Sequence, residues 1–192
     1  SYFYPDQIVV NVAGTNTFMD GFYIAAAAGG RLAGTTNVAI PLTNKTLSGF
    51  SILNNKLLKS SFLNDLGSIG ATVLQPTSGG GRILASRTTS NSGFVEDEEL
   101  SIIFIRDRVK QILRASMKGY IGRVQSSDTI TAIEVKMNSI MNGLVAQGII
   151  TEFSGLRVAV DKVDPRQLNV YVGFVPAYPV NYVFIEIEVG VQ

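Results

Sequence analysis

Apolar positions in the central part of the chain repeat with the period of an amphipathic helix. One long helix is predicted from about Asp97 to Lys118, with apolar residues three and four places apart along one face. A second is predicted from about Thr129 to Gln147, with Ser127 or Asp128 as its cap and Gly148 as its stop. The apolar faces are Ile102, Ile105, Val109, Ile112, Leu113 and Met117 in the first helix, and Ile130, Ile133, Met137, Ile140, Met141 and Leu144 in the second.

Two shorter helices are predicted earlier in the chain. Phe22–Ala33 is rich in Ala and Gly, with Asp20 as its predicted N-cap and Gly34 as its stop. Asn55–Leu66 carries an apolar residue at every fourth position. Residues 35–53, between the two helices, are predicted to be a loop with little regular structure.

Strands are predicted where β-branched residues and alternation with period two occur. Ile8–Val12 is a short run of this kind, and Ile69–Leu74 with Arg82–Thr89 is predicted to form a hairpin around a glycine-rich turn. Three further strands are predicted in the last third of the chain, at Leu156–Val163, Leu168–Phe174 and Tyr182–Val191. The predicted fold class is therefore α+β: a mixed, mainly antiparallel sheet flanked by three to four helices, with a β-rich C-terminal linking strand.

Composition narrows the possible functions of this 192-residue chain. Hydrophobic residues make up 46% and charged residues 16%, which excludes a disordered chain and suggests that much of the surface faces other protein. The net charge is +1, so no overall field attracts nucleic acid or acidic lipid. Histidine and cysteine are absent, which removes His-based acid–base catalysis, Ser-His-Asp triads, thiol nucleophiles and zinc sites with nitrogen or sulfur ligands.

Two local clusters invite a ligand-binding interpretation that their spacing does not support. The loop Gly79–Arg82 runs into a strand and lacks the Lys-Ser/Thr step and helix of a nucleotide-binding loop, so a hairpin turn is favoured. The acidic run Glu96–Glu99 lacks the alternating spacing of a calcium loop, and acids in the first turn of a helix complement its dipole. We therefore predict no catalytic residue, no cofactor and no metal site. The longest early apolar run, Phe22–Ala28, is far shorter than the roughly 20 residues that span a bilayer, so no membrane insertion is predicted.

Four cations lie at strict i, i+4 spacing along the longest predicted helix: Arg106, Lys110, Arg114 and Lys118, here called the cationic stripe. One interpretation is that they complement the negative end of the helix, which explains Arg114 and Lys118 better than Arg106. The other is an electrostatic docking strip for an acidic partner. Nucleic acid is a weaker third option, because no aromatic residue interleaves the stripe.

Several segments, taken in order, resemble the core and C-terminal domain of the contractile-tail sheath proteins of bacteriophages. The resemblance covers nearly all of the chain from about residue 8, with an Ala/Gly-rich helix, a Leu-Asn-x-x-Gly-Ile signature, an Arg-Thr-Thr strand end, an aromatic-Ile-Gly step, a Gly-Ile helix end, a Val-Pro step and a β-rich terminus. The corresponding residues here are Tyr23–Gly34, Leu63–Gly67 with Ile69 one place later than usual, Arg87–Thr89, Tyr120–Gly122, Gly148–Ile149, Val175–Pro176 and Tyr182–Val191.

The resemblance implies a structural subunit and no enzyme. Such subunits form a helical homo-oligomer around an inner tail tube, with baseplate and tail terminator at the ends, and contract to drive the tube through the host envelope for genome ejection. The implied location is the virion, after assembly in the bacterial cytoplasm. Residues 1–192 would be a single core/C-terminal domain. Family members are usually longer, and Ser1 is not an initiator Met, so we expect a compact variant or the retained part of a longer protein.

The resemblance also assigns roles to two surfaces. The cationic stripe is expected to face an acidic inner tube without direct contact to nucleic acid. The C-terminal arm, about residues 180–192, is expected to add a strand to the sheet of an adjacent subunit, because a long apolar edge strand is a hazard for a free monomer. The apolar face of this strand, with Glu186 and Glu188 opposite, is Val183, Ile185, Ile187, Val189 and Val191.

Two other functions remain open at this stage. A ring-forming tail adaptor or terminator would also be structural, but it would make closed rings of fixed copy number where a sheath makes open tubes. A small α+β enzyme would need a histidine-free site built from Lys, Asp or Glu, and no spacing marks one.

Overall fold

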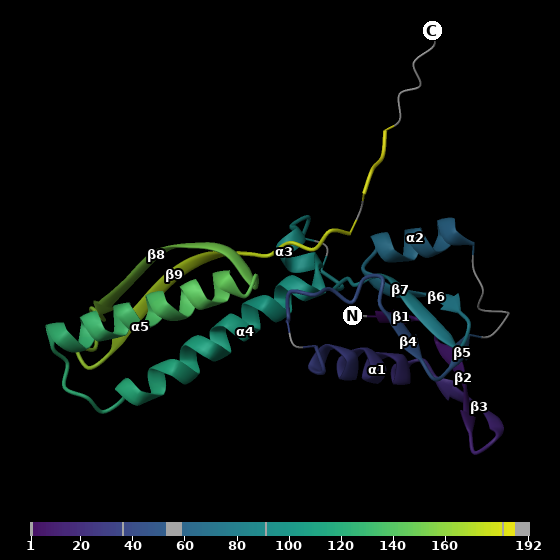
Figure 1. The fold of residues 1–192 in the computed structure, drawn as a ribbon, viewed down its shortest axis with the longest axis horizontal. Helices are drawn as coiled ribbons and strands as arrows, with labels where there is room; N and C mark the ends of the chain where they lie inside the picture. The colour runs from purple at the N-terminus through teal and green to yellow at the C-terminus, as the bar shows by residue number, and fades with distance from the viewer. Residues whose placement is uncertain (1, 36, 53–58, 91, 182, 187–192) are drawn as a thin grey trace, which may run out of the picture.

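The computed structural model describes residues 2–35, 37–52, 59–90, 92–181 and 183–186. The described chain forms an elongated molecule with two lobes (Figure 1). The first lobe holds the sheets of the N-terminal half, and the second holds the two longest helices and a C-terminal hairpin. Each lobe has its own cluster of buried apolar side chains.

The first lobe is built on two small sheets. One has the strand order β1-β6-β7-β4, in which only the β1–β6 pair is parallel. The other has the order β3-β2-β5 and is antiparallel. The strand bounds are β1 Tyr2–Tyr4, β2 Gln7–Val12, β3 Thr15–Asp20, β4 Thr46–Ser48, β5 Ser51–Ile52, β6 Ala71–Thr77 and β7 Gly80–Ala85.

Two helices flank these sheets. Helix α1 spans Phe22–Ala33 as predicted, but its N-cap is Gly21, because Asp20 ends β3. Gly21 donates its N–H to the carbonyl of Asp6, and its missing side chain leaves room for that backbone contact. Helix α2 spans Ser60–Ser68; the earlier start predicted for it, at Asn55, lies outside the described residues.

The predicted loop at 35–53 was partly wrong, because it contains β4 and β5. These strands are very short, and each is held by partners far away in sequence, so no alternation long enough to predict them exists. They matter because Leu47 and Phe50 are buried in the first core. That core consists of Ile8, Ile24, Ala28, Leu42, Leu47, Phe50, Leu74 and Ile83.

The second lobe is a pair of helices covered by a hairpin. Helix α4 (Leu100–Met117) runs beside α5 (Ser127–Ala146), and the antiparallel strands β8 (Ile150–Val160) and β9 (Leu168–Pro176) lie along α5 (Figure 1). A short 3₁₀ helix, Lys118–Tyr120, follows α4. The buried cluster of this lobe is Ile105, Val109, Met141, Leu144, Ile149 and Ile150.

Both long helices differ at their starts from the prediction. Ser126 caps α5, since its hydroxyl accepts a hydrogen bond from the N–H of Thr129 at 3.2 Å, where Ser127 or Asp128 had been predicted. The predicted helix from Asp97 is two helices, α3 (Val95–Glu98) and α4, separated by Glu99 in an extended conformation. The break occurs because backbone groups at 98–100 pair with residues 86–88 across a β-bridge between Arg87 and Glu99.

The α+β fold class is confirmed, with mainly antiparallel strand pairing. The glycine-rich loop is the predicted hairpin turn, although β7 begins within it, at Gly80. Gly80 lies against β4, and a Cβ atom there would overlap the carbonyl oxygen of Leu47. Glycine is therefore required at this position by close packing of two strands, and not by a ligand.

We expect Gly80→Ala to lower the free energy of unfolding by about 1–3 kcal/mol, the usual cost of forcing atoms into a packed site. Gly143→Ala is the matched control, because Gly143 lies within α5 with open space around its Cα. This control should raise stability by about 0.5–1 kcal/mol through helix propensity. Urea unfolding of both variants measures the difference, and an equal response of the two would contradict the role given to Gly80.

Candidate assembly surfaces

The cationic stripe forms an exposed row along α4 that ends at its C-cap, Lys118. Arg106, Lys110, Arg114 and Lys118 are all exposed, and the apolar face predicted for the same helix points inward, with Ile105 and Val109 fully buried. Arg106 lies 3.7 Å from the carboxylate of Asp97. Within the described residues no acidic side chain pairs with the other three. The stripe therefore offers at least three cations to a partner.

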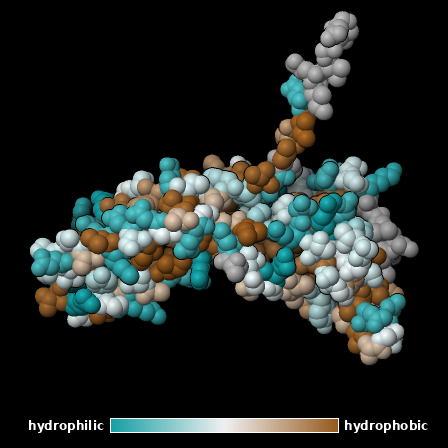
Figure 2. All heavy atoms as spheres, viewed as in Figure 1, coloured by the Kyte–Doolittle hydropathy of each residue, from teal (hydrophilic) through white to brown (hydrophobic). Residues whose placement is uncertain are grey.

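Residues 183–186, the part of the C-terminal arm beyond Asn181 that the structure describes, leave the body without pairing to it. Residues 183–186 form no strand in the described chain, so the strand predicted at Tyr182–Val191 is not present there within one subunit. Val183, Phe184 and Ile185 are 75%, 95% and 79% exposed, and the segment is brown where it leaves the body in Figure 2. Ile187, Val189 and Val191 lie outside the described residues.

The β8–β9 hairpin has two open edges. The strands pair with each other from Ile150↔Pro176 to Val160↔Leu168, and no other strand of the described chain pairs with either outer edge. One face of the hairpin lies against the helices. Unpaired edges of this length are templates for an added strand.

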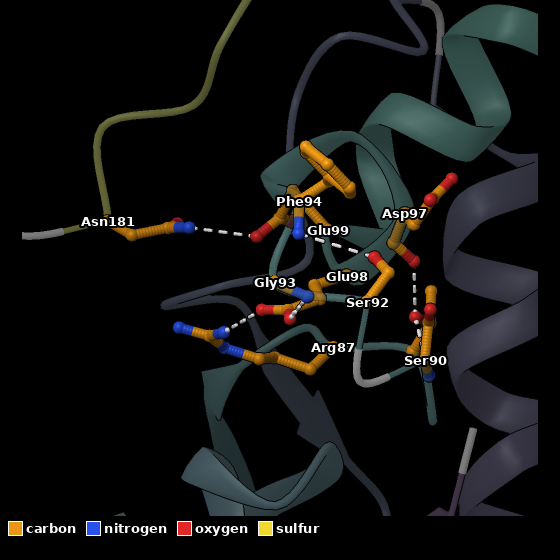
Figure 3. A network of polar contacts seen from close by, with 10 residues as sticks. Arg87, Ser90, Ser92, Gly93, Phe94, Asp97, Glu98, Glu99 and Asn181 are labelled. Atoms are coloured by element: carbon orange, nitrogen blue, oxygen red, sulfur yellow. Dashed lines mark hydrogen bonds and ion pairs between the residues drawn. The ribbon is translucent and has the colours of Figure 1, made fainter.

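The acidic run Glu96–Glu99 lies at the junction of three segments (Figure 3). Glu98 accepts hydrogen bonds from Arg87, at 3.1 Å, and from the N–H of Gly93, also at 3.1 Å. Glu96 accepts a hydrogen bond from the hydroxyl of Tyr178, which lowers the pKa of Glu96 and raises the pKa of Tyr178. Each of these acids is thus engaged with another part of the chain.

Glu99 is the buried member of this run, with only 4% of its surface exposed. Its carboxylate accepts hydrogen bonds from Ser101 at 3.2 Å and from the side-chain amide of Asn181 at 2.8 Å, as Figure 3 shows for Asn181. Burial raises the pKa of Glu99, and the bonds from Asn181 and Ser101, with the charge of Arg87, oppose that effect only in part. A buried carboxylate is costly unless it is hydrogen-bonded, so the stability of the fold depends on the donors to Glu99.

Sequence reasoning placed Glu99 among the acids of a first helical turn and so missed its burial, and it did not single out Tyr178 or Asn181. A signal for Glu99 was available, since it precedes Ile102 by three positions and therefore falls on the apolar face of the helix pattern. No comparable signal marks Tyr178 or Asn181, because their partners lie 82 residues away.

The described residues contain neither a cluster of metal-ligating side chains nor a helix fit to span a membrane. No three acidic side chains there are grouped in a way that could hold a metal ion. None of the helices there combines the length and apolar character needed to cross a bilayer.

The fold of this chain matches solved structures, although its sequence matches no known family. No family model matches the chain, and no curated protein matches it in sequence. A chain of the anti-feeding prophage helical sheath in the contracted state matches with a TM-score of 0.78 over 97% of this chain, at 15% identity. The chain has the fold of a contractile sheath protein.

Two other solved structures share this sheath fold. One is a chain of the sheath complex of an extracellular contractile injection system, PVC, in the contracted state, with a TM-score of 0.73 and 12% identity over 97% of this chain. The other is a sheath tail protein from Listeria innocua, with a TM-score of 0.65 and 15% identity over 89% of this chain. The chain spans about half the length of these proteins: 54%, 55% and 45% of the three, in the order given.

The raised pKa of Glu99 predicts how stability depends on pH. The folded protein holds the Glu99 proton more tightly than the unfolded chain, whose carboxyl titrates near 4.5, so this residue favours folding at low pH. That contribution is lost as the pH rises through the folded pKa. Glu99→Gln should therefore raise the melting temperature by a few degrees at pH 7, and the gain should shrink as the pH falls toward 4. Calorimetry across this range measures it; a difference that does not vary with pH would contradict the assignment.

Proposed function

We propose that this chain is a structural subunit of a contractile sheath and not an enzyme. Subunits would assemble as a helical lattice around an inner tube and contract to drive that tube through the envelope of a target cell. The observation that carries this proposal is the combination, in a chain with the sheath fold, of an unpaired apolar arm and a hairpin with open edges. Each subunit thus offers both halves of a head-to-tail contact that does not close on itself.

Strand addition accounts for both surfaces with one interaction. An arm that pairs with the β8–β9 edge of a neighbour would satisfy its own backbone groups and those of the hairpin. It would also bury apolar side chains that are 75% to 95% exposed in the single subunit. Full burial of each such side chain is worth about 1.5–3 kcal/mol. The link would be made by the main chain, so neighbouring bodies could move relative to each other without separating.

The cationic stripe is proposed to contact an acidic inner tube. Three of its four members have no acidic partner within the described chain, so they can pair with another molecule at little internal cost. Compensation of the helix end explains Lys118 and Arg114, but not Lys110 in the middle of α4. Docking by several exposed cations would hold the tube while allowing release, because each exposed ion pair is weak.

The remaining parts of the proposal follow from the sheath role. Residues 1–192 would act as one core/C-terminal domain, with a baseplate and a tail terminator as partners at the two ends of the lattice. The subunit would be part of a virion or virion-like particle, assembled in the bacterial cytoplasm, with no direct contact to nucleic acid and no cofactor. The similarity to sheath chains of the anti-feeding prophage and of the PVC contractile injection system supports this setting.

Reversing the charge of the stripe should weaken attachment to the tube. Lys110→Glu with Arg114→Glu is the preferred pair, because a Glu at 106 would also repel Asp97. We expect binding about tenfold weaker at low salt, with a smaller difference at high salt where charges are screened. Co-sedimentation with the inner tube of the same particle measures this.

Lys136→Glu with Lys162→Glu changes the net charge equally at exposed positions off α4, so it serves as the control. Equal weakening by both pairs, or a location of the stripe on the outer surface of the assembled particle, would overturn the docking role.

Deleting Ile187–Gln192 should abolish tube formation and leave a folded body. The full chain is expected to form open tubes of variable length in negative-stain micrographs, whereas a ring-forming adaptor would give closed rings. The truncated chain should keep its helical circular dichroism and its melting temperature, because both cores lie outside the deleted segment. Glu186→Gln, on the polar face of the arm, is a control that should still polymerise. Tubes formed normally by the truncated chain, or arms paired only within their own subunit, would refute the linking role.

A further inference from the structure

Between β9 and the exposed arm, residues 177–181 cross from the second lobe to α3. The yellow segment in Figure 1 follows this path and then points away from the β8–β9 hairpin. The N–H of Ala177 donates to the carbonyl of Ile149, 3.1 Å away, and closes the end of the hairpin. Two side chains then bind the α3 region: Tyr178 donates to Glu96, and Asn181 donates to Glu99 at 2.8 Å.

Asn181 donates to a carboxylate, that of Glu99, whose position is fixed by its surroundings. Glu99 is 4% exposed, its second oxygen accepts the bond from Ser101, and its backbone bridges to Arg87. Hydrogen bonds to a charged acceptor of this kind are stronger than neutral ones. The Tyr178 contact is exposed and adds to the same attachment.

Asn181 is also the last residue with such a contact in the described chain. No hydrogen bond between residues 183–186 and the body is present in the part of the chain that the structure describes. Val180, immediately before Asn181, is already 81% exposed, and Phe184 is 95% exposed, so Asn181 is an attachment point within an exposed stretch. The direction of the arm is therefore set at Asn181.

A free arm would have a competing partner in its own subunit. The hairpin edges are open, and the arm follows β9 directly in the chain, so a turn within residues 177–181 would let it fold back on its own hairpin. Two segments joined by a short linker meet at an effective concentration of about millimolar, which favours the internal pairing over that with a neighbour. An arm that acts between subunits needs a device against this.

We propose that Asn181 and Glu99, assisted by Tyr178 and Glu96, form a clasp that keeps the arm off its own hairpin and presents it to another subunit. These residues position the arm for strand addition to another subunit. The proposal rests on the proposed sheath function, because only an assembling subunit needs its arm held in this way. The clasp draws residues 177–181 onto α3, so the turn needed for internal pairing cannot form while the Asn181–Glu99 bond is intact. The amide oxygen of Asn181 is buried without a partner in the described chain, so a single donor bond to Glu99 holds this side chain.

The test measures the position of the arm in the full-length monomer. The chain contains no cysteine, so spin labels can be placed at Phe184→Cys and at Glu152→Cys on the exposed side of β8 without removing native thiols. In the parent we expect one long distance between the labels. Asn181→Ala should add a short-distance population, with a change of about tenfold or more in the ratio of clasped to released arm, the effect of losing one bond to a charged acceptor.

Asn169→Ala is the matched control, because it also removes an Asn amide that donates to a carboxylate, that of Asp161 at 2.7 Å, but at the far end of the hairpin. It should leave the label distance unchanged. If Asn181→Ala alone unfolds the body, Asn181→Ala combined with Glu99→Gln takes its place. The neutral amide of Gln avoids a buried charge that has lost a hydrogen-bond donor. An unchanged distance distribution in a folded Asn181 variant overturns the clasp.

The rate of tube formation distinguishes a failure of the clasp from a failure of the proposed sheath function. If the clasp guides strand addition, Asn181→Ala should form tubes more slowly than Asn169→Ala at equal concentration, under conditions where circular dichroism shows both variants to be folded. A released arm with a parental rate of tube formation overturns the role in strand addition. If the parent forms no tubes at all, the sheath function fails, and the label distances still decide whether the clasp holds the arm.

Discussion

A buried carboxylate needs hydrogen-bond donors, and the donors of Glu99 come from two separate segments of the chain. Ser101 supplies one from the first turn of α4, and Asn181 supplies the other from the segment after β9. The backbone at Glu99 pairs with the residues that follow β7. The break between α3 and α4, the path of residues 177–181 and the direction of the arm all depend on this junction.

The same junction lies where the two apolar cores meet along one helix. Leu100, at the start of α4, packs against the core of the first lobe, while Ile105 and Val109 are buried in the core of the second. The loop after α1 makes a further connection, since Val38 and Ala39 pack against the second core and Asn37 donates to the carbonyl of Gln147. Side chains of both lobes therefore pack against α4, and the loop after α1 links the first lobe to the second.

The spacing of apolar residues predicted the elements in which that spacing repeats over many residues. Helices α1, α4 and α5 and the β6–β7 hairpin were found because an apolar face recurs over several turns, or because two strands are joined by a glycine-rich turn. Strands β1, β4 and β5 were missed because each has three residues or fewer and pairs with a segment distant in the chain. Strand β3 was also missed, because it is largely exposed and its sequence has no alternation of apolar and polar residues. The stripe was found for the same reason as the helices, and the structure leaves it exposed as expected.

By itself, the sequence determined the α+β class, the two long helices with their buried and charged faces, and an apolar C-terminal end in a chain without histidine or cysteine. These are local properties, set by the spacing of side chains along one element. The tertiary structure alone decided that Glu99 interrupts a helix and is buried, and that Asn181 binds it. It also decided that, among the described residues, the hairpin edges and residues 183–186 stay unpaired. Such features depend on which distant segments meet, and the free energy of a buried polar contact belongs to the pair and cannot be assigned from either residue alone.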